Sequence, residues 1–311
     1  MSQVSMQDVK ELRDRTQAGL NDCRSAMVEA GGDMEKAVEI ILKKGLAKSA
    51  KRAGAVASEG LVLARVAADA KSGVIVEVNI QTDFAARNAD FVAFAEKVAE
   101  AASKAKAGAE LGAEPMPGGS GTVEDARAAL VGKLGENITV RRWERLTVDG
   151  PGAVHAYVHM GGKIGVLLSA RSANDAATQS PEFTKFLDDT AMQAAAMSPV
   201  YLATSEVPAD AKAKQSEIYD AQLAEEGKPE KARPKIIEGK LAKWQKEICL
   251  LEQESVLEPG KTVDQIRREL GQKLGGDISV TRFVRFERGE GVEKPLGDDF
   301  AAEVAKMAGG A

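Results

Sequence analysis

The sequence contains few of the residues on which enzymes depend. In 311 residues there are two histidines, His155 and His159, and two cysteines, Cys23 and Cys249. Neither a Gly-x-x-x-x-Gly-Lys-Ser/Thr phosphate loop nor a Gly-x-Ser-x-Gly elbow is found. No cluster of Cys, Asp or Glu accompanies the two histidines to complete a metal site. We therefore expect no metal, no cofactor and no enzymatic activity.

Other scarce features exclude other classes of protein. No run of about 18 apolar residues is present, so no membrane-spanning helix is expected. The two cysteines lie far apart, which argues against a disulfide framework and favours a reducing cytoplasm. The net charge of -5 gives no electrostatic reason to expect nucleic acid or an anionic membrane. With 44% hydrophobic and 29% charged residues, the chain has the composition of a globular protein of two or three domains.

Residues 5–45 show the spacing of three short helices. Apolar residues recur at helical intervals, Gly31 and Gly32 end the second helix, and Asp33 is placed to cap the third. About 40 residues make a helical module that is marginal alone. The basic stretch Lys43–Arg52 follows. It has two interpretations, a solvated helix end that leads into a linker, or a contact to an acidic partner surface.

An internal repeat organises the chain from residue 59 onward. A shift of 92 residues places the first copy on the second, and further along the shift becomes 140. The matching segments are Gly60–Val62 with Gly152–Val154, Gly73–Ile75 with Gly165–Leu167, and Lys133–Gly135 with Lys273–Gly275. The difference, 140 minus 92, gives 48 net extra residues in the second copy. They should lie between about 200 and 255, where Gly227–Pro229 separates two polar helical arms.

Each copy has the pattern strand, strand, helix, helix, strand. The strands expected in the first copy are Leu61–Ala67, Val74–Ile80 and Ile138–Leu146, the first two antiparallel because their connection is short. The predicted fold class is α+β, with a three-helix N-terminal module, a core of two related α+β subdomains with antiparallel sheets, an inserted antiparallel helical hairpin and a C-terminal helix. The expected boundaries are 1–55 for the module and linker, 56–150 for the first subdomain, 151–202 and 251–286 for the second, 203–250 for the hairpin, and 287–311 for the C-terminal module.

Three segments fall outside the repeat pattern. The glycine-rich stretch 108–121 is predicted to be a flexible loop. A short amphipathic helix is expected at Asp299–Met307. The residues available for the seam of the hairpin are Ile218, Leu223, Ile237, Leu241 and Trp244.

The two copies differ where the second strand meets the first helix. The first copy has Thr82, Asp83 and Phe84 there, and Phe84 aligns with Ala176 of the second copy. The fold can thus make this connection without an aromatic residue. A large apolar ring beside a carboxylate in a loop is a candidate protruding anchor, unless Phe84 folds back onto its own core.

Three stretches carry a resemblance to a known family. Glu77–Phe84 (Glu-Val-Asn-Ile-Gln-Thr-Asp-Phe), Leu12–Arg24 and Tyr157–Gly165 are similar to motifs of the elongation factor Ts family. The resemblance extends over nearly all of residues 5–311. Arg24 stands where the family usually has Lys, which keeps the positive charge.

The resemblance implies a guanine-nucleotide exchange factor that binds elongation factor Tu and promotes GDP release during translation elongation. The loop of Thr82, Asp83 and Phe84 would enter the GTPase near its Mg²⁺ and phosphate site. The N-terminal module would have a ubiquitin-associated-type fold and contact the GTPase, and the C-terminal helix would return to it. From the second subdomain, His159 would add a contact. The module residues expected at the interface are Arg13, Leu20, Asn21 and Arg24. The hairpin, a short coiled coil, would serve self-association or reach the partner.

Other readings of the residues remain open at this point. The chain could be a scaffold that binds a protein without affecting any nucleotide. It could bind RNA through Lys43–Arg52 and the strand that carries Arg141, Arg142 and Arg145, although alternating charge on a strand is usually a solvated face and the overall composition is acidic. An enzyme is the least favoured class.

Overall fold

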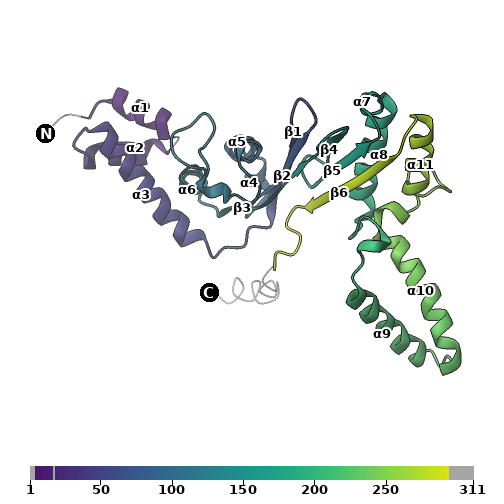
Figure 1. The fold of residues 1–311 in the computed structure, drawn as a ribbon. Helices are drawn as coiled ribbons and strands as arrows, with labels where there is room; N and C mark the ends of the chain where they lie inside the picture. The colour runs from purple at the N-terminus through teal and green to yellow at the C-terminus, as the bar shows by residue number, and fades with distance from the viewer. Residues whose placement is uncertain (1–3, 17, 294–311) are drawn as a thin grey trace.

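The N-terminal module consists of three helices, as predicted from the apolar spacing. The computed structural model describes residues 4–16 and 18–293 (Figure 1). The helices are α1 (Met6–Thr16), α2 (Leu20–Glu29) and α3 (Met34–Arg52). Their shared core includes the buried side chains of Leu12, Cys23 and Met27. Asp33 caps α3, since its carboxylate accepts a hydrogen bond from the Lys36 amide at 3.1 Å.

The second half of α3 attaches the module to the rest of the chain. It packs on α6 (Val123–Leu134), and a Cβ added to Gly45 would lie 3.3 Å from the carbonyl oxygen of Ala128. The buried Ser49 accepts a hydrogen bond from Arg127 at 2.7 Å. The expectation of a merely solvated basic helix end is therefore wrong for one face of α3, because small residues there allow close helix packing.

The core contains two three-stranded antiparallel sheets, with strand orders β1-β2-β3 and β4-β5-β6. The first copy comprises β1 (Glu59–Val66), β2 (Ser72–Ile80), α4 (Asp83–Ala86), α5 (Ala89–Lys104), α6 and β3 (Ile138–Thr147). The second comprises β4 (Gly152–His159), β5 (Ile164–Ser172), α7 (Asp175–Thr178), α8 (Pro181–Met197), α11 (Val263–Lys273) and β6 (Ile278–Glu287). The predicted repeat and its strand directions are thus confirmed. In each subdomain the helices cover one face of the sheet, where the cores lie.

The opposite faces of the two sheets pack on each other in a reciprocal way. A Cβ added to Gly73 would lie 2.8 Å from Val154, and one added to Gly165 would lie 2.5 Å from Val62. Gly165 and Val154 are the repeat equivalents of Gly73 and Val62. The interface is therefore isologous in form, as in a two-fold dimer, although both halves belong to one chain.

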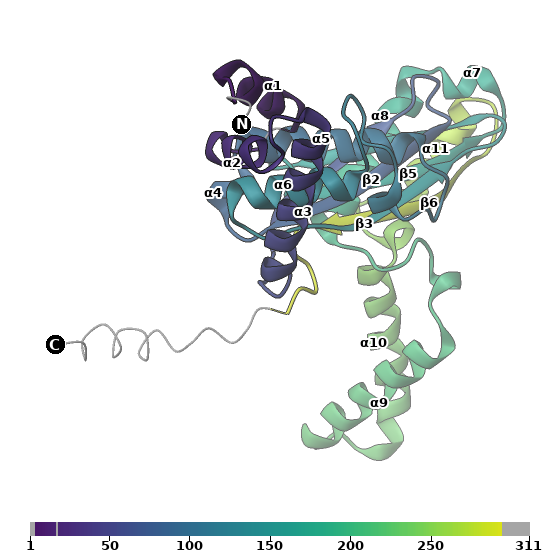
Figure 2. The same ribbon diagram turned by 90° about the vertical axis from the view of Figure 1, so that its left-hand side faces the viewer.

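Two helices between α8 and α11 project away from the core (Figures 1 and 2). They are α9 (Ala209–Glu225) and α10 (Arg233–Ile248), with a 3-10 turn at Glu230–Ala232 before α10. Arg233 contacts Asp220 at 3.5 Å, and Leu223 is buried, whereas Ile218 is 42% exposed. The two helices therefore contact each other, and of the residues predicted for their seam Leu223 is buried. No helix in the described part of the chain is both long enough and apolar enough to cross a membrane.

The glycine-rich stretch 108–121 is not the flexible loop that its composition predicted. It contains a short 3-10 helix, Leu111–Ala113, and its Leu111 and Met116 are buried in the first core. Trp143 donates a hydrogen bond to the carbonyl of Ala109 at 3.0 Å. Two apolar side chains and one indole fix the path of the loop despite its glycines.

Candidate partner-binding site

The loop after β2 is braced by the turn that precedes β3. The Thr82 hydroxyl caps α4 by accepting from the Ala85 amide at 3.2 Å. The same hydroxyl donates to the carboxylate of Glu136 at 2.8 Å, and the Thr82 amide donates to it at 3.1 Å. Next to it, the side-chain oxygen of Gln81 accepts from the Asn137 amide at 2.7 Å. The loop is consequently held at both its backbone and its side chains.

This loop presents Phe84 to solvent. The side chain is 84% exposed, the largest exposure among the large hydrophobic residues that the structure describes. Asp83 is the first residue of α4, and its carboxylate lies 3.3 Å from the Arg87 guanidinium. Ala86 is buried and anchors the short helix. Phe84 therefore does not fold back onto its own core, and its ring remains available for a partner.

The same connection in the second subdomain has the same backbone but no ring. Asn174 caps α7 by accepting from the Ala177 amide at 2.8 Å, and Asp175 is the first residue of that helix. Ala176 then occupies the position of Phe84. An acidic residue at the helix start is thus common to both loops, whereas the aromatic ring is specific to the first.

The turn between β4 and β5 is the second exposed feature. The Tyr157 hydroxyl lies 2.9 Å from Nδ1 of His159, and the two rings stack with centroids 5.9 Å apart. Met160 beside them is 69% exposed. The amide of Val62 donates to the carbonyl of Gly162 at 2.8 Å, which fixes the turn against the first subdomain. His159 is accordingly an exposed side chain on a rigid turn.

The local structure accounts for the other histidine, His155, and for the two cysteines. His155 lies 3.1 Å from Asp188 on α8, so the two histidines contact different partners. Burial raises the pKa of Cys23, and it raises that of Cys249 to about 11, which keeps both thiols protonated. Within residues 4–16 and 18–293, no group of three or more His, Cys, Asp or Glu side chains is placed to hold a metal ion.

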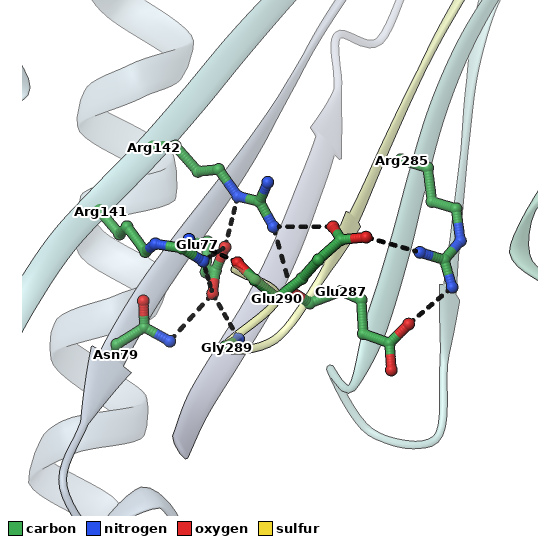
Figure 3. A network of polar contacts seen from close by, with 8 residues as sticks. All are labelled: Glu77, Asn79, Arg141, Arg142, Arg285, Glu287, Gly289 and Glu290. Atoms are coloured by element: carbon green, nitrogen blue, oxygen red, sulfur yellow. Dashed lines mark hydrogen bonds and ion pairs between the residues drawn. The ribbon is translucent and has the colours of Figure 1, made fainter. Parts of the chain in front are cut away.

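The chain leaves β6 through a buried polar network centred on Glu77 (Figure 3). This side chain of β2 is fully buried. It accepts hydrogen bonds from the Gly289 amide at 2.7 Å, from Asn79 at 2.9 Å and from Arg142 at 2.5 Å, and Arg141 lies 3.1 Å away. Burial alone would raise the pKa of Glu77, but the hydrogen bonds outweigh it and the pKa is lowered.

Sequence reasoning missed this network. The alternating charges predicted a solvated strand face for Arg141 and Arg142, and that expectation is wrong because both contact the buried Glu77. The third arginine, Arg145, donates instead to the last carbonyls of α5, those of Ala102 and Ser103. One signal was available in the sequence, since the repeat equivalent of Glu77 is a neutral residue, Ser169.

The Phe84 loop, the His159 turn and the exit of the chain lie around the same end of the first sheet. β1 begins there at Glu59, opposite Ile80 at the end of β2. Arg288 follows β6, contacts the Glu59 carboxylate at 2.9 Å and donates its amide to the carbonyl of Lys163 at 2.9 Å. The expected helix at Asp299–Met307 lies outside the described residues.

The predicted contact residues of the N-terminal module are all exposed. Leu20 is an apolar residue at the first turn of α2 and is 42% exposed. The other three are Arg13, Asn21 and Arg24. Through α3 the module rests on α6, whose following turn carries Glu136, the partner of Thr82. The module and the Phe84 loop are thus connected through α6.

Comparison with known sequences gives the family of the chain. A sequence model described as elongation factor TS matches residues 81–290. The elongation factor Ts of Clostridium perfringens (strain SM101) is 46% identical over 308 residues, covering 98% of this chain and 99% of that protein. That of Nitratiruptor sp. is 45% identical over 304 residues, covering 97% and 98% respectively. The chain belongs to the elongation factor Ts family.

Proposed function

We propose that the chain is a guanine-nucleotide exchange factor that binds the GDP form of elongation factor Tu and promotes release of GDP in translation elongation. The observation that carries this proposal is the exposed Phe84 on a braced loop, at a position where the equivalent loop has Ala176. Together with family membership, it supports a role for the Thr82–Phe84 loop near the Mg²⁺ and phosphate site of the GTPase.

The free energy of burying one phenylalanine side chain is too small for Phe84 to drive GDP release alone. An exchange factor must bind the nucleotide-free GTPase more tightly than the GDP form. By reciprocity, it lowers the affinity of the GTPase for GDP by the same factor. Moving the ratio of nucleotide-free to GDP-bound GTPase from 1:99 to 99:1 takes about 5.5 kcal/mol of differential binding free energy. Burial of one Phe side chain supplies about 1.5–3 kcal/mol. The ring therefore acts as the tip of a larger interface.

The larger interface would draw on the other exposed elements. The N-terminal module, with a ubiquitin-associated-type arrangement, would contact the GTPase through Arg13, Leu20, Asn21 and Arg24. His159 would contribute from the second subdomain, and the C-terminal module would return to the GTPase. The α9–α10 hairpin would pair with a second copy or reach the partner. In this scheme the chain acts by binding alone, in the cytoplasm, without membrane or nucleic acid.

Asp83 has two available roles in this scheme. Its carboxylate is half-buried and lies 3.3 Å from Arg87. It would either place negative charge beside the Mg²⁺–phosphate arrangement or engage partner groups that hold the ion. Asp83→Asn separates the two roles, because an amide retains the hydrogen-bond acceptor but not the charge.

The proposal is tested by the release of a fluorescent GDP analogue from elongation factor Tu. Sub-stoichiometric amounts of the chain should accelerate release, because one molecule serves many GTPases in turn. A scaffold would bind elongation factor Tu and leave the release rate unchanged. An RNA-binding factor would retain labelled RNA at physiological salt, which an exchange factor would not.

A further inference from the structure

The residues after β6 occupy a defined seat on the first subdomain. The Gly289 amide points at the Glu77 carboxylate, and the Arg142 side chain donates to the carbonyl of Glu287 at 3.0 Å (Figure 3). Arg141 bonds the carbonyl of Glu290. A carboxylate and two arginines of the first subdomain thus bind the backbone of the segment 287–290 directly.

The seat requires glycine at position 289. The backbone φ of Gly289 is +72°, a region that side chains rarely adopt, and an added Cβ would lie 2.2 Å from the carbonyl oxygen of Ser58. Ser58 belongs to the linker that precedes β1. The exiting chain is therefore enclosed between this linker and β2.

The second subdomain shows that the fold does not need the seat. At the equivalent place Ser169 bonds Thr281 at 2.8 Å, so a neutral pair replaces Glu77 and Arg141 beside the same bulge. Among the residues that the structure describes, no segment fills this place. It is an open groove of about 410 Å³, bordered in part by Ser169, Arg171 and Arg282. A sheet of this design thus forms without a buried carboxylate, and what Glu77 adds is the attachment of residues 287–290.

We propose that Glu77 is a positioning residue that holds the base of the C-terminal segment on the strand that ends in the Thr82–Phe84 loop. Glu77 lies on β2, and Asp83, the first residue of the helix that follows β2, comes six residues later in the chain. At about 3.3 Å per residue they are about 20 Å apart at most. Residues 287–290 and the loop therefore move as one unit, and a partner that engages one meets the other in a fixed direction. The functional part of this inference rests on the proposed exchange activity.

The first arm of the test needs no partner. Amide hydrogen exchange of residues 287–293 is followed in the full chain for Glu77→Gln and Gly289→Ala. Loss of a hydrogen bond to a charged group predicts exchange faster by about tenfold or more. The matched controls are Ser169→Ala, which removes the equivalent side chain, and Gly150→Ala, which has the same kind of backbone (φ +73°) with no atom near an added Cβ. Unchanged protection of these amides in both test variants would contradict the proposal that Glu77 holds residues 287–290.

The second arm measures GDP release from elongation factor Tu. Each test variant should slow release by about tenfold, and the double variant should be no slower than either single one, because both act through one contact. A purely structural role for Glu77 predicts independent effects that multiply in the double variant, and that outcome overturns the inference. Gly289→Ala leaves Glu77 in place, so a failure of Glu77→Gln to fold does not remove the test. An inactive wild type with protected amides would instead contradict the proposed function and leave the seat intact.

Discussion

The two subdomains have the same framework, and three of the positions at which their residues differ bear on the proposed interface. β2 and β5 begin and end at equivalent positions at a shift of 92, and both are followed by a capped four-residue helix. Within this framework Phe84 corresponds to Ala176, and Glu77 corresponds to Ser169. At the turn between the first two strands of each copy, the second copy carries the larger side chain, since His159 corresponds to Ala67. What the copies share serves the fold, and what they do not share marks the proposed interface.

The reciprocal packing of the sheets accounts for the shared part. The amide of Val62 bonds the carbonyl of Gly162 at 2.8 Å, and that of Val154 bonds the carbonyl of Ala70 at 2.7 Å. Each contact is the repeat equivalent of the other. One turn thus faces Val62 with His159 beside it, while its counterpart has Ala67 at the position of His159.

Truncation of the ring that only one copy carries should have the largest effect. Phe84→Ala removes about 1.5–3 kcal/mol of burial at a partner surface, which corresponds to GDP release slower by about 10- to 100-fold. The melting temperature should be unchanged, because the side chain is 84% exposed. Stopped-flow release and thermal unfolding measure the two. Val200→Ala is a control at another exposed apolar residue, and an equal loss there would remove the special role of Phe84.

The shared interface can be tested from both sides. Gly73→Ala and Gly165→Ala each force a Cβ against the opposite sheet, at 2.8 and 2.5 Å. Overpacking of this kind costs about 1–3 kcal/mol in the free energy of unfolding, and the two losses should be similar. Urea denaturation gives both values. Gly54→Ala, which has no atom within 4 Å of the added Cβ, should cost nothing. A loss confined to one of the two glycines would contradict the reciprocal packing.

The contribution of the buried Glu77 carboxylate to the stability of the protein should depend on pH in a distinctive way. Arg141 and Arg142 face Glu77, with Glu290 beyond them, and the folded pKa lies below the ordinary value of 4.5. The stabilisation is therefore full above about pH 4.5 and is lost as the pH falls through the lowered folded pKa. The difference in melting temperature between wild type and Glu77→Gln should stay constant from about pH 7 to 5 and shrink at lower pH. A difference that does not depend on pH would contradict this.

The smallest effect is expected at the turn of the second copy. Tyr157→Phe removes the hydroxyl that lies 2.9 Å from His159 Nδ1 and leaves the stacked ring. The loss of one such hydrogen bond is worth about 0.5–1.5 kcal/mol, or about 2- to 10-fold in affinity for elongation factor Tu. Titration calorimetry measures it. Tyr219→Phe on α9 is the matched control, and an equal loss there would show that the orientation of His159 is not involved.

Local pattern predicted the framework well, because repeated apolar spacing and caps act over short distances. The strands at Val74–Ile80 and Ile138–Leu146 differ from the observed ones by no more than two residues at either end. The stretch 108–121 was mispredicted, since its order depends on Leu111 and Met116 reaching a distant core. Composition does not contain that information.

The candidate site was predicted in part. The contrast of Phe84 with Ala176 was visible in the sequence, and the exposure of the ring agrees with it. The bracing of Thr82 by Glu136 was not, because the two residues are 54 positions apart. The contact of Glu77 with Gly289 spans 212 positions and has no local signature.

The most direct test of the account is to exchange the distinguishing residue between the copies. In the variant Phe84→Ala/Ala176→Phe the chain keeps its composition and both capped loops, so only the place of the ring changes. The account predicts that this variant releases the fluorescent GDP analogue from elongation factor Tu as slowly as Phe84→Ala alone. Release at the wild-type rate would contradict the claim that the first loop acts on the GTPase.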